Sequence, residues 1–504
     1  MSMKYSSSTT NDWVNINGKP YITVSSKGIS NKLSTKPNDG ADFGPDTTLG
    51  ATSPSQIGPP YTQTYGIQEA INYVFAQNGG KIVIKNGIYD LTNASFQPWL
   101  EGTASGCKIL IPENDISTND IIPIEIVGES SVWPNSELVS GTFSNPPNFG
   151  VVIRSLDNAS TLGITGNNYV ILSTYYPATS NIPVNGVDIL LDQISFVTLA
   201  GTGIGGVNLE GASSMTVPNL VIGVNSSFPL PEPSSSVGAY GFQGNAHETN
   251  KNCIGNLYVY GYYYGISIGS HTNIGRLSAI GNYWVLQLLS VTHLQLLSVT
   301  HGSQIDFMVA EWNTNIFVIP NQGSVSSLNL HVTKIVVSDN QDPSGMSWAN
   351  ASSYVKYGGS YTSPIITIDI WEQPYAQLTS LQAGIFVPGG GVVHIKNVFP
   401  SSFAATSISA NPPVSGTVYL NGNPYDIRLK IPVTYNPTTT AAATLATGIS
   451  PTSTVTTTTK VSIPAGLTAA DGEILTYEMV VPAGWYYELV ATNATIGTAE
   501  VQAE

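Results

Sequence analysis

The sequence is poor in charged side chains, and basic ones are the scarcest. Only 10% of its 504 residues are Asp, Glu, Lys or Arg, where a soluble domain has about 25%. The chain has 17 Lys and Arg and 32 Asp and Glu, which gives a formal net charge of −15. Because so few cations cannot form a basic surface for a phosphate backbone, we expect no nucleic-acid partner.

Two further absences narrow the class of protein. No run of 18 apolar residues occurs, so we expect no membrane span. The first residues, MSMKYSSSTTNDW, lack the apolar stretch of a secretion signal, so we expect none. Cys107 and Cys253 are the two cysteines, too few and too far apart for a metal cluster. We predict two buried thiols rather than a disulfide, and neither metal nor cofactor.

What remains is a chain that should fold almost entirely as β-structure. Short runs of Val, Ile, Tyr and Thr alternate with turn residues, among them 49 Gly and 32 Pro. One helix is predicted over 65–80, with a strand following over 81–91. The helix prediction depends on apolar residues spaced three or four apart and on a Gly79-Gly80 stop; these residues are Ile67, Ala70, Ile71, Val74 and Phe75.

The middle of the chain contains a repeat with an offset of 20 residues. The segment NCIGNLYVYGYYYGISIG, from Asn252, aligns with TNIGRLSAIGNYWVLQLL, from Thr272. Ile254 then matches Ile274, and Tyr264 matches Trp284. Short strands repeating at this interval predict a parallel β-helix, in which equivalent residues stack in ladders. An antiparallel sandwich with a chance repeat is the alternative.

A second repeat is much shorter. The octapeptide LQLLSVTH occurs at 286–293 and again at 294–301. Eight residues are too few for one coil, so we interpret it as a tandem duplication in a loop or at a coil edge. Extra strand sequence in the stack is the alternative.

The pattern of the sequence changes near residue 411. About seven short alternating segments follow, separated by turn signals, which predicts a small antiparallel β-sandwich; the Thr-, Ala- and Ser-rich stretch 436–458 is expected to be partly loop. The predicted domains are an N-terminal arm at 1–37, a β-helix at 38–410 and a sandwich at 411–504.

The N-terminal segments resemble a known superfamily. NDGAD (38–42), IQEAINYVFAQNGGKIVIKNGIYDL (67–91), IEIVGES (124–130) and VVIRS (151–155) are similar to the start of pectate-lyase-like right-handed β-helix proteins. The resemblance implies a right-handed parallel β-helix with the helix as its N-terminal cap. It implies little about activity, because many functions use this fold.

The C-terminal region, 415–502, resembles β-sandwich modules of β-helix proteins from archaeal viruses and some phages. This resemblance implies a viral structural protein on the virion exterior, a spike or tail fibre made in the host cytoplasm. It also implies a homo-oligomer, with a trimer favoured, that contacts other virion proteins and a host-surface receptor or glycan. The sparse charge further predicts tolerance of acid, since little repulsion develops when carboxylates are neutralised.

Candidate catalytic residues are few. A glycosidase needs two carboxylates about 5 to 10 Å apart. Asp188 and Asp192 would lie about 13 Å apart on one strand, which is too far. Asp306 and Glu311 near Trp312, and Asp369 and Glu372 around Trp371, are weak candidates for sugar-cleaving subsites. No catalytic residue is therefore assigned, and the sequence favours a non-enzymatic protein over an enzyme.

Aromatic residues are the better candidates for binding. If Leu257 and Val259 face the core, Tyr258 and Tyr260 should face outward, and aromatic side chains with polar tips suit sugars and interfaces. An aromatic ladder that only stabilises the coil corner is the alternative. The predicted binding residues are Tyr258, Tyr260, Tyr262, Tyr263, Tyr264, Trp284 and Trp312.

The histidines give no metal motif. His247-Glu248 lacks a second His, and His271, His293 and His301 are expected at the surface or in turns. The sequence thus favours a non-enzymatic attachment protein of a virion. A polysaccharide-degrading lyase or hydrolase on the same fold is the alternative, and a cellular surface adhesin is a third hypothesis.

Overall fold

The structure is a computed structural model of the chain. It describes residues 19–29, 37–100, 104–114, 121–130, 150–163, 169–176, 186–201, 203–226, 239–244, 252–269, 271–288, 301–311, 313, 315–319, 328–338, 355–357, 366–373, 393–400, 408–409, 413–421, 426–438, 440–466, 474–482 and 485–503. The chain divides into two compact units, Met1–Thr333 with Ser338–Ser360, and Lys334–Val337 with Tyr361–Glu504. The predicted boundaries at 37 and 410 stay predictions.

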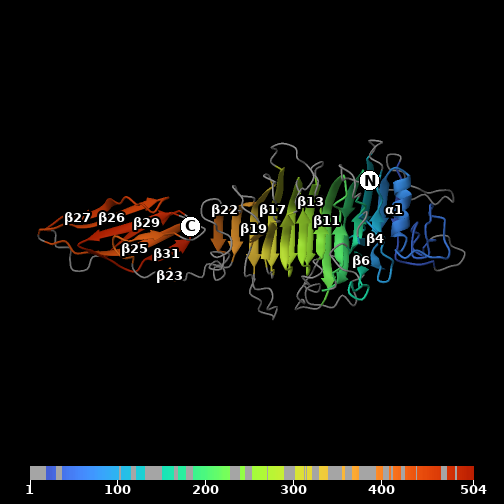
Figure 1. Cartoon of the computed structure of the whole chain (residues 1–504), viewed down its shortest axis with the longest axis horizontal. Coiled ribbons are helices and arrows are strands. Elements are labelled where there is room, and N and C mark those ends of the chain that lie inside the picture. Colours follow the sequence, from blue (N-terminus) through green and yellow to red (C-terminus); the bar gives the residue numbers. More distant parts are fainter. Residues whose placement is uncertain are drawn as a thin grey trace. The chain divides into compact units, whose positions relative to one another are not determined.

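The first unit is built on two parallel sheets, and successive strands alternate between them for most of its length (Figure 1). In the longer sheet the order is β1-β2-β5-β8-β11-β13-β15-β17-β19, with β3, β6 and β9 joined to it. Its strands are β1 (Tyr21–Val24), β2 (Gly80–Ile84), β3 (Gly87–Asp90), β5 (Ile122–Gly128), β6 (Val151–Ser155), β8 (Val187–Asp192), β9 (Ile194–Leu199), β11 (Ser214–Asn225), β13 (Asn252–Tyr260), β15 (Thr272–Ile280), β17 (His301–Glu311) and β19 (Leu328–Ser338).

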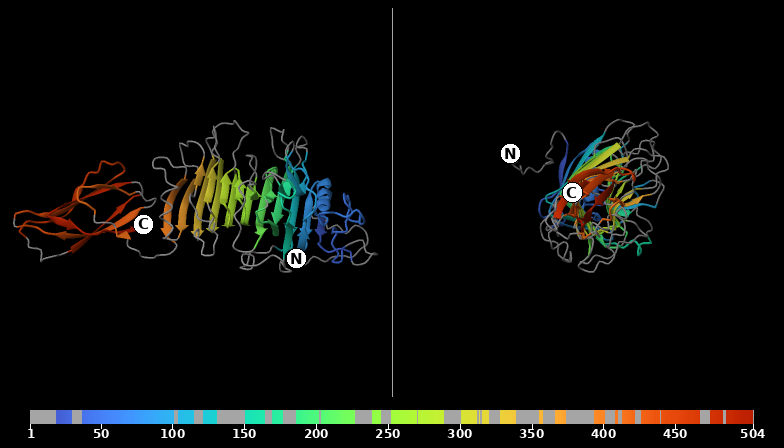
Figure 2. Two further views of the ribbon diagram at one scale, coloured as in Figure 1. Left: turned by 60° about the horizontal axis from the view of Figure 1, so that its bottom comes forward. Right: turned by 90° about the vertical axis from the view of Figure 1, so that its left-hand side faces the viewer.

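The second parallel sheet has the order β4-β7-β10-β12-β14-β16-β18-β20. In Figure 2 the strands of this unit follow one another in chain order. This arrangement is consistent with the predicted parallel β-helix. The strands are β4 (Gly106–Ile111), β7 (Tyr169–Thr174), β10 (Gly205–Asn208), β12 (Tyr240–Gln243), β14 (Tyr264–Ile268), β16 (Trp284–Leu288), β18 (Asn315–Ile319) and β20 (Val355–Tyr357).

The 20-residue repeat sets the strand register as predicted. Ile254 pairs with Ile274 and Leu257 with Leu277 between β13 and β15. Tyr264 pairs with Trp284 between β14 and β16. The two leucines are buried, so the core consists of ladders of equivalent side chains that stack from coil to coil, because parallel strands in register place like residues about 5 Å apart.

The predicted helix is confirmed as α1 (Ile67–Ala76), and it contacts β1, β2, β4 and β5. Its buried apolar face includes Ile67, Ala70, Ile71 and Val74. The strand predicted over 81–91 is two strands, β2 and β3. They are separated by Lys85 and Asn86. The second strand begins at Gly87, whose φ is +156° and where an added Cβ would clash with Ser26 Oγ.

The second unit contains part of β19 (Lys334–Val337) followed in the parallel sheet by β21 (Ile366–Gln373) and β22 (Val393–Pro400), and two antiparallel sheets. One sheet has the order β23-β31-β25-β28 with β30 beside β25, and the other has the order β24-β29-β26-β27. The strands are β23 (Ile408–Ser409), β24 (Val418–Leu420), β25 (Ile427–Tyr435), β26 (Ala443–Ser450), β27 (Thr458–Ile463), β28 (Ile474–Val481), β29 (Tyr486–Thr492), β30 (Ala494–Ile496) and β31 (Glu500–Ala503).

The stretch 436–458 is partly loop as predicted, and it also contains β26, in which Ala443, Leu445 and Thr447 alternate inward and are buried. The prediction of two buried thiols needs correction. Cys107 is a buried free thiol as predicted, whereas Cys253 is free but exposed, since it lies on the outer face of β13 next to buried Ile254. In the described ranges no helix has the length and hydropathy needed to cross a bilayer.

Candidate functional site: an aromatic corner

Five aromatic side chains gather at the first residues of β12, β14 and β16 and in the turns that precede β14 and β16. We call them the aromatic corner: Tyr240, Tyr263, Tyr264, Tyr283 and Trp284. Each turn begins with a glycine at positive φ, Gly261 at +82° and Gly281 at +60°. A Cβ at Gly261 would clash with Val224 Cγ2, so the turn can approach the core only without a side chain there.

The rings of the aromatic corner form two short stacks. Tyr240 lies on Tyr264 with centroids 4.9 Å apart and planes at 17°. Tyr263 lies on Tyr283 at 4.8 Å and 9°. Tyr263 meets Tyr264 edge-on at 4.7 Å, which joins the stacks. The faces therefore pair largely with one another, and the edges and hydroxyl groups are what the corner can offer to a ligand.

Burial differs across the aromatic corner. The four tyrosines are half-buried, and Trp284 is 5% exposed. Burial raises the pKa of Tyr263 and of Tyr264. Their hydroxyl groups thus stay protonated at any physiological pH and can both donate and accept hydrogen bonds.

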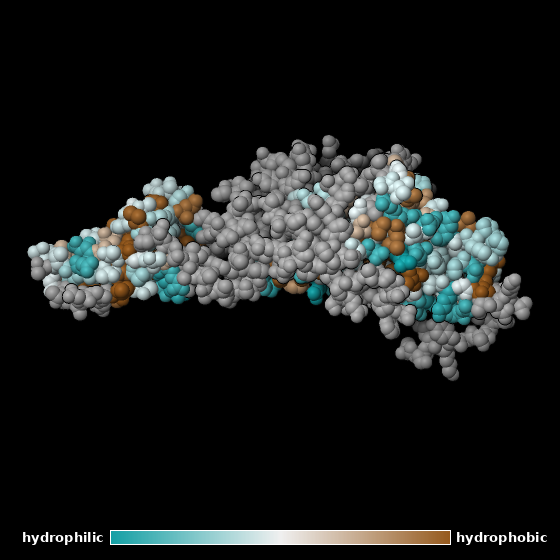
Figure 3. All heavy atoms as spheres, turned by 90° about the horizontal axis from the view of Figure 1, so that it is seen from below, coloured by the Kyte–Doolittle hydropathy of each residue, from teal (hydrophilic) through white to brown (hydrophobic). Residues whose placement is uncertain are grey.

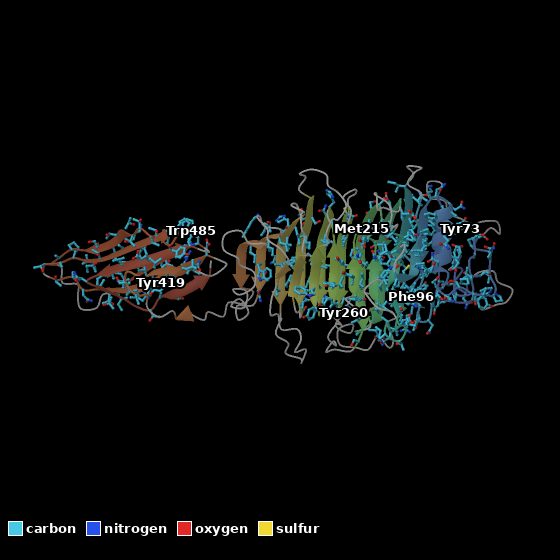
Figure 4. The ribbon with its side chains drawn as sticks, in the orientation of Figure 1. Tyr73, Phe96, Met215, Tyr260, Tyr419 and Trp485 are labelled. Carbon is cyan, nitrogen blue, oxygen red and sulfur yellow. The ribbon has the colours of Figure 1, made fainter. Side chains whose placement is uncertain are left out.

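Tyr258, Tyr260 and Tyr262 were predicted with these residues, but they are buried, with exposed fractions of 8%, 5% and 2%. Figure 4 places Tyr260 among the parallel strands, where its ring covers Gly223 so closely that a Cβ there would clash with it. Burial raises the pKa of Tyr258 and of Tyr260. Tyr258 and Tyr260, predicted to face outward, are therefore covered, and so is Tyr262, predicted at the corner.

Tyr262 belongs instead to a buried asparagine ladder under the aromatic corner. Its hydroxyl bonds Thr198 Oγ1 at 2.9 Å and donates to the Gly223 carbonyl. Its backbone N–H donates to Asn282 Oδ1 at 3.0 Å. The backbone N–H of Asn282 donates in turn to Asn313 Oδ1 at 2.8 Å. This chain fixes the turn that positions Tyr263 and Tyr283, because buried amides pair fully only in one geometry.

The space beside the aromatic corner is small. A pocket of about 20 Å³ is lined by residues that include Thr198, Gly261, Tyr262 and Tyr263, which is room for about one water. Ligand pockets for small molecules are usually about 300–1,000 Å³. The corner therefore suits contact along a surface, as with a polymer chain, better than enclosure of a single sugar.

A larger hollow of about 330 Å³ lies on β1, β2 and β5, lined by Lys19, Tyr21, Lys81 and Glu125 among others. Lys81 Nζ lies 3.6 Å from Glu125 Oε2 across it, and Lys19 Nζ donates to the Asn78 carbonyl. Its opposite charges thus already have partners within the chain. No sequence pattern pointed to this hollow, since it joins residues far apart in the chain.

The acidic candidates do not form a carboxylate pair. Asp306 is exposed and accepts a bond from Gln304 Nε2 at 2.7 Å. Glu311 lies five residues on along β17, about 16 Å away. Trp312, predicted beside them, lies outside the described residues.

The two candidate acids on β21, Asp369 and Glu372, each have a lysine on a neighbouring strand. Lys396 Nζ lies 2.7 Å from Asp369 Oδ1, and Lys334 Nζ lies 2.7 Å from Glu372 Oε2. Trp371 is fully buried, and its Nε1 donates to Gln373 Oε1. Its ring therefore has no surface for a sugar.

Asp192 stabilises the outer face of the longer sheet. Its Oδ1 accepts the backbone N–H of Asn219 at 3.0 Å and the side-chain amide at 3.2 Å. Asn256 continues the row by donating to Asn219 Oδ1 at 2.9 Å. Asp188 and Asp192 both lie on β8 as predicted, and this row gives Asp192 a structural role.

Glu210 is a functional candidate that no sequence pattern indicated. It follows β10 in a turn, where its backbone N–H donates to Asn208 Oδ1 and its Oε2 accepts Gln243 Nε2 at 2.7 Å. Burial raises the pKa of this carboxyl to about 7. Burial, and then the Glu210 charge, raises the pKa of Tyr176 to about 12. A single Glu in a turn carries no sequence signal of this kind.

The described histidines lie apart from any metal-binding cluster. Among described residues no three His, Cys, Asp or Glu side chains could hold a metal ion together. His271 lies in a turn with φ at +56°, and His301 begins β17. His247, Glu248 and His293 lie outside the described residues. Comparison of the chain with protein-family models and with curated proteins finds no match.

Proposed function

We propose that this chain is an attachment protein of a virion exterior that binds extended glycans of the host surface through the aromatic corner. The observation that supports binding is the group of half-buried tyrosines, Tyr240, Tyr263, Tyr264 and Tyr283, whose rings form two stacks joined by the edge contact of Tyr263 with Tyr264. Tyrosine combines an apolar ring with a polar tip, which suits the alternating surfaces of a sugar chain.

The virion assignment depends on the resemblance of 415–502 to modules of archaeal-virus proteins. With it we propose a right-handed β-helix capped by α1, which packs on β1, β2, β4 and β5. We also propose that the antiparallel sheets form a sandwich. A hydrogen bond between Thr447 on β26 and Tyr477 on β28 joins the two sheets and supports this packing.

The test compares Tyr263→Ala and Tyr283→Ala with Tyr61→Ala, since Tyr61 is 52% exposed and remote from the aromatic corner in sequence. We expect the two corner variants to lose at least about tenfold in affinity for host glycans on an array, which corresponds to about 1.4 kcal/mol. The Tyr61 variant should bind as the parent does. Equal binding by all three variants would refute the aromatic corner as the site. Absence of the protein from purified particles would refute the virion assignment.

The second candidate is a polysaccharide-degrading enzyme of the same fold, and Glu210, whose Oε2 accepts Gln243 Nε2 at 2.7 Å and whose pKa burial raises to about 7, is the residue to test as its general acid. Release of reducing ends or of unsaturated products from host glycans would reveal that activity. Glu210→Gln should abolish it while leaving glycan affinity unchanged. Absence of product over a broad glycan panel would leave the binding function alone.

A further inference from the structure

The edge strand β28 has the features of a strand-pairing surface that has no partner strand among the described residues. Among the described strands it pairs on one side only, with β25. Ile474, Leu475 and Val480 are 61%, 40% and 38% exposed. Figure 3 shows hydrophobic residues at the surface of this C-terminal region. An edge strand of this length and polarity is a template for pairing with another strand.

The other edges of the two antiparallel sheets are protected in ways that β28 is not. The opposite edges, β23 and β24, have only two and three residues. The edge strand β27 carries an exposed lysine, Lys460. By contrast, β28 has eight residues, ILTYEMVV, without Lys, Pro or Gly. Short strands and lysines are the usual protection against strand addition.

The one charge on β28 is compensated within its own sheet. Glu478 lies opposite Lys430 on β25, and its Oε2 is 3.9 Å from Arg428 Nη1. A strand arriving at this edge therefore meets little net charge. An acidic or basic peptide would gain no favourable charge interaction at this edge, whereas a strand with the same apolar pattern as β28 would bury its apolar side chains against it.

We infer that β28 pairs antiparallel with β28 of a second copy of this chain about a two-fold axis. Outward residues of β28 are even-numbered and inward ones odd-numbered, because Val481 and Tyr477 face the core side. When the two-fold axis is perpendicular to the sheet, outward residues of one copy lie opposite outward residues of the other. A register shifted by one residue would instead place outward residues opposite inward ones.

Among such registers, one centred on Tyr477 fits the side chains. It places Ile474 opposite Val480 and Thr476 opposite Glu478 on the outer face, with Leu475 opposite Met479 on the inner face. A register centred on Glu478 would put two carboxylates face to face, which is destabilising. A register centred on Thr476 would pair only five residues. The sequence of β28 is thus self-complementary in one register.

A single strand pair buries an area at the low end of specific interfaces, below about 1,200 Å². We therefore expect a monomer–dimer equilibrium that responds to concentration. A two-fold pair also differs from the trimer expected for the proposed virion protein, and sedimentation separates these outcomes. The dimer does not depend on glycan binding.

The first experiment is sedimentation of the full chain over a range of concentrations. The double variant Ile474→Lys with Val480→Lys places lysines directly opposite one another in the pair, so we expect at least about tenfold weaker dimerisation. The matched control is Leu420→Lys on β24, which is 50% exposed and should dimerise as the parent does. All variants are checked for an unchanged melting temperature.

The second experiment tests the register in a Cys253→Ser background. Thr476→Cys and Glu478→Cys chains, mixed and oxidised, should give a disulfide-linked dimer, because opposite Cα atoms in an antiparallel pair lie about 4.5–5.5 Å apart. Either variant alone should remain unlinked. A monomer at every concentration, a dimer or trimer unaffected by the two lysines, or crosslinking of a single variant would each overturn the inference.

Discussion

Arg154 on β6 and Asp90 on β3 are register partners on adjacent strands, and Arg154 binds one carboxylate oxygen through two nitrogens. Nε and Nη2 lie 2.9 Å and 2.6 Å from Asp90 Oδ2. Burial alone would raise the pKa of Asp90, but hydrogen bonds from Thr92 and Arg154 outweigh it, and the pKa is lowered. The pair thus stabilises the fold above the ordinary pKa of Asp, and this contribution is lost as the pH falls through the lowered value.

Asp90→Asn should therefore lower the free energy of unfolding at pH 7 by about 1 kcal/mol. The difference from the parent should shrink as the pH falls from about 4 toward about 2. Melting temperatures measured across this acid range and at neutral pH test this, and a difference that is constant over the range would contradict the role given to the pair.

Glu210 should show the opposite pH dependence. Its pKa is raised to about 7 in the folded chain, so the folded state binds its proton more tightly than the unfolded state does. The contribution is greatest below the ordinary pKa of Glu and falls as the pH rises to about 7. Glu210→Gln should be more stable than the parent at pH 8, by on the order of 1–3 kcal/mol, and similar to it at pH 4. A loss of stability at pH 8 would refute this.

Lys108 and Asp157 form a buried ion pair, with Nζ 2.7 Å from Oδ2 and exposed side-chain fractions of 1% and 7%. Lys108 also donates to the Ala94 carbonyl and lies 3.9 Å from the centre of the Phe96 ring. Lys108→Met leaves a carboxylate buried without its cation, which should cost about 3–5 kcal/mol. Lys81→Met, in the exposed pair with Glu125, should cost less than about 1 kcal/mol. Urea midpoints compare them, and equal costs would contradict the prediction.

The stability of the chain should be sensitive to the replacement of one side-chain nitrogen in the asparagine ladder under the aromatic corner. Asn282 Nδ2 donates to the Val259 carbonyl and to Asn313 Oδ1, both at 3.2 Å. Asn282→Asp replaces this donor by an oxygen that faces two acceptors, and should cost about 2 kcal/mol. Asn273→Asp, at an exposed position of β15, is the control and should change the melting temperature little. A tolerated Asn282→Asp would show that the ladder is dispensable.

Gly261 combines two constraints that a pair of variants can separate. Gly50 has φ at +74°, and an added Cβ there would have no atom within 4 Å, whereas Gly261 has φ at +82° and a Cβ there would clash with Val224 Cγ2. Gly50→Ala should cost about 1–2 kcal/mol for the backbone conformation alone. Gly261→Ala should cost clearly more by thermal denaturation, because the core must also move. Equal costs would mean that the turn relaxes freely.

Much of the fold was predictable because its information is local or periodic. The 20-residue offset fixed which residues stack between β13 and β15 and between β14 and β16, and the structure confirms those pairs. The helix α1 was predictable from its apolar spacing. The strand β26 was missed because its alternation uses Ala, Leu and Thr within a Thr-rich stretch, a weak apolar signal.

The candidate site was harder to predict. Alternation along a strand shows which face of the sheet a side chain is on, but it does not show whether other residues cover that side chain. Tyr258 and Tyr260 alternate with Leu257 and Val259 as predicted, yet they are covered. The pair Tyr262 and Asn282 occupies equivalent positions of the repeat, and that was the available signal for the ladder. Glu210 and the Lys108–Asp157 pair depend on contacts between distant segments, which no single sequence pattern records.

The coil register has a consequence for the connections between successive strands. Between β14 and β15 three residues connect the strands, and between β16 and β17 twelve do. Pairing is nevertheless in step on both sides, Ile254 with Ile274 and Ile274 with Ile305. Residues 286–288 of the LQLLSVTH duplication belong to β16 and His301 begins β17, while residues 289–300 lie outside the described residues. The described ladders thus stay aligned although the number of residues that connect successive strands differs fourfold, so the side-chain register does not fix the length of these connections.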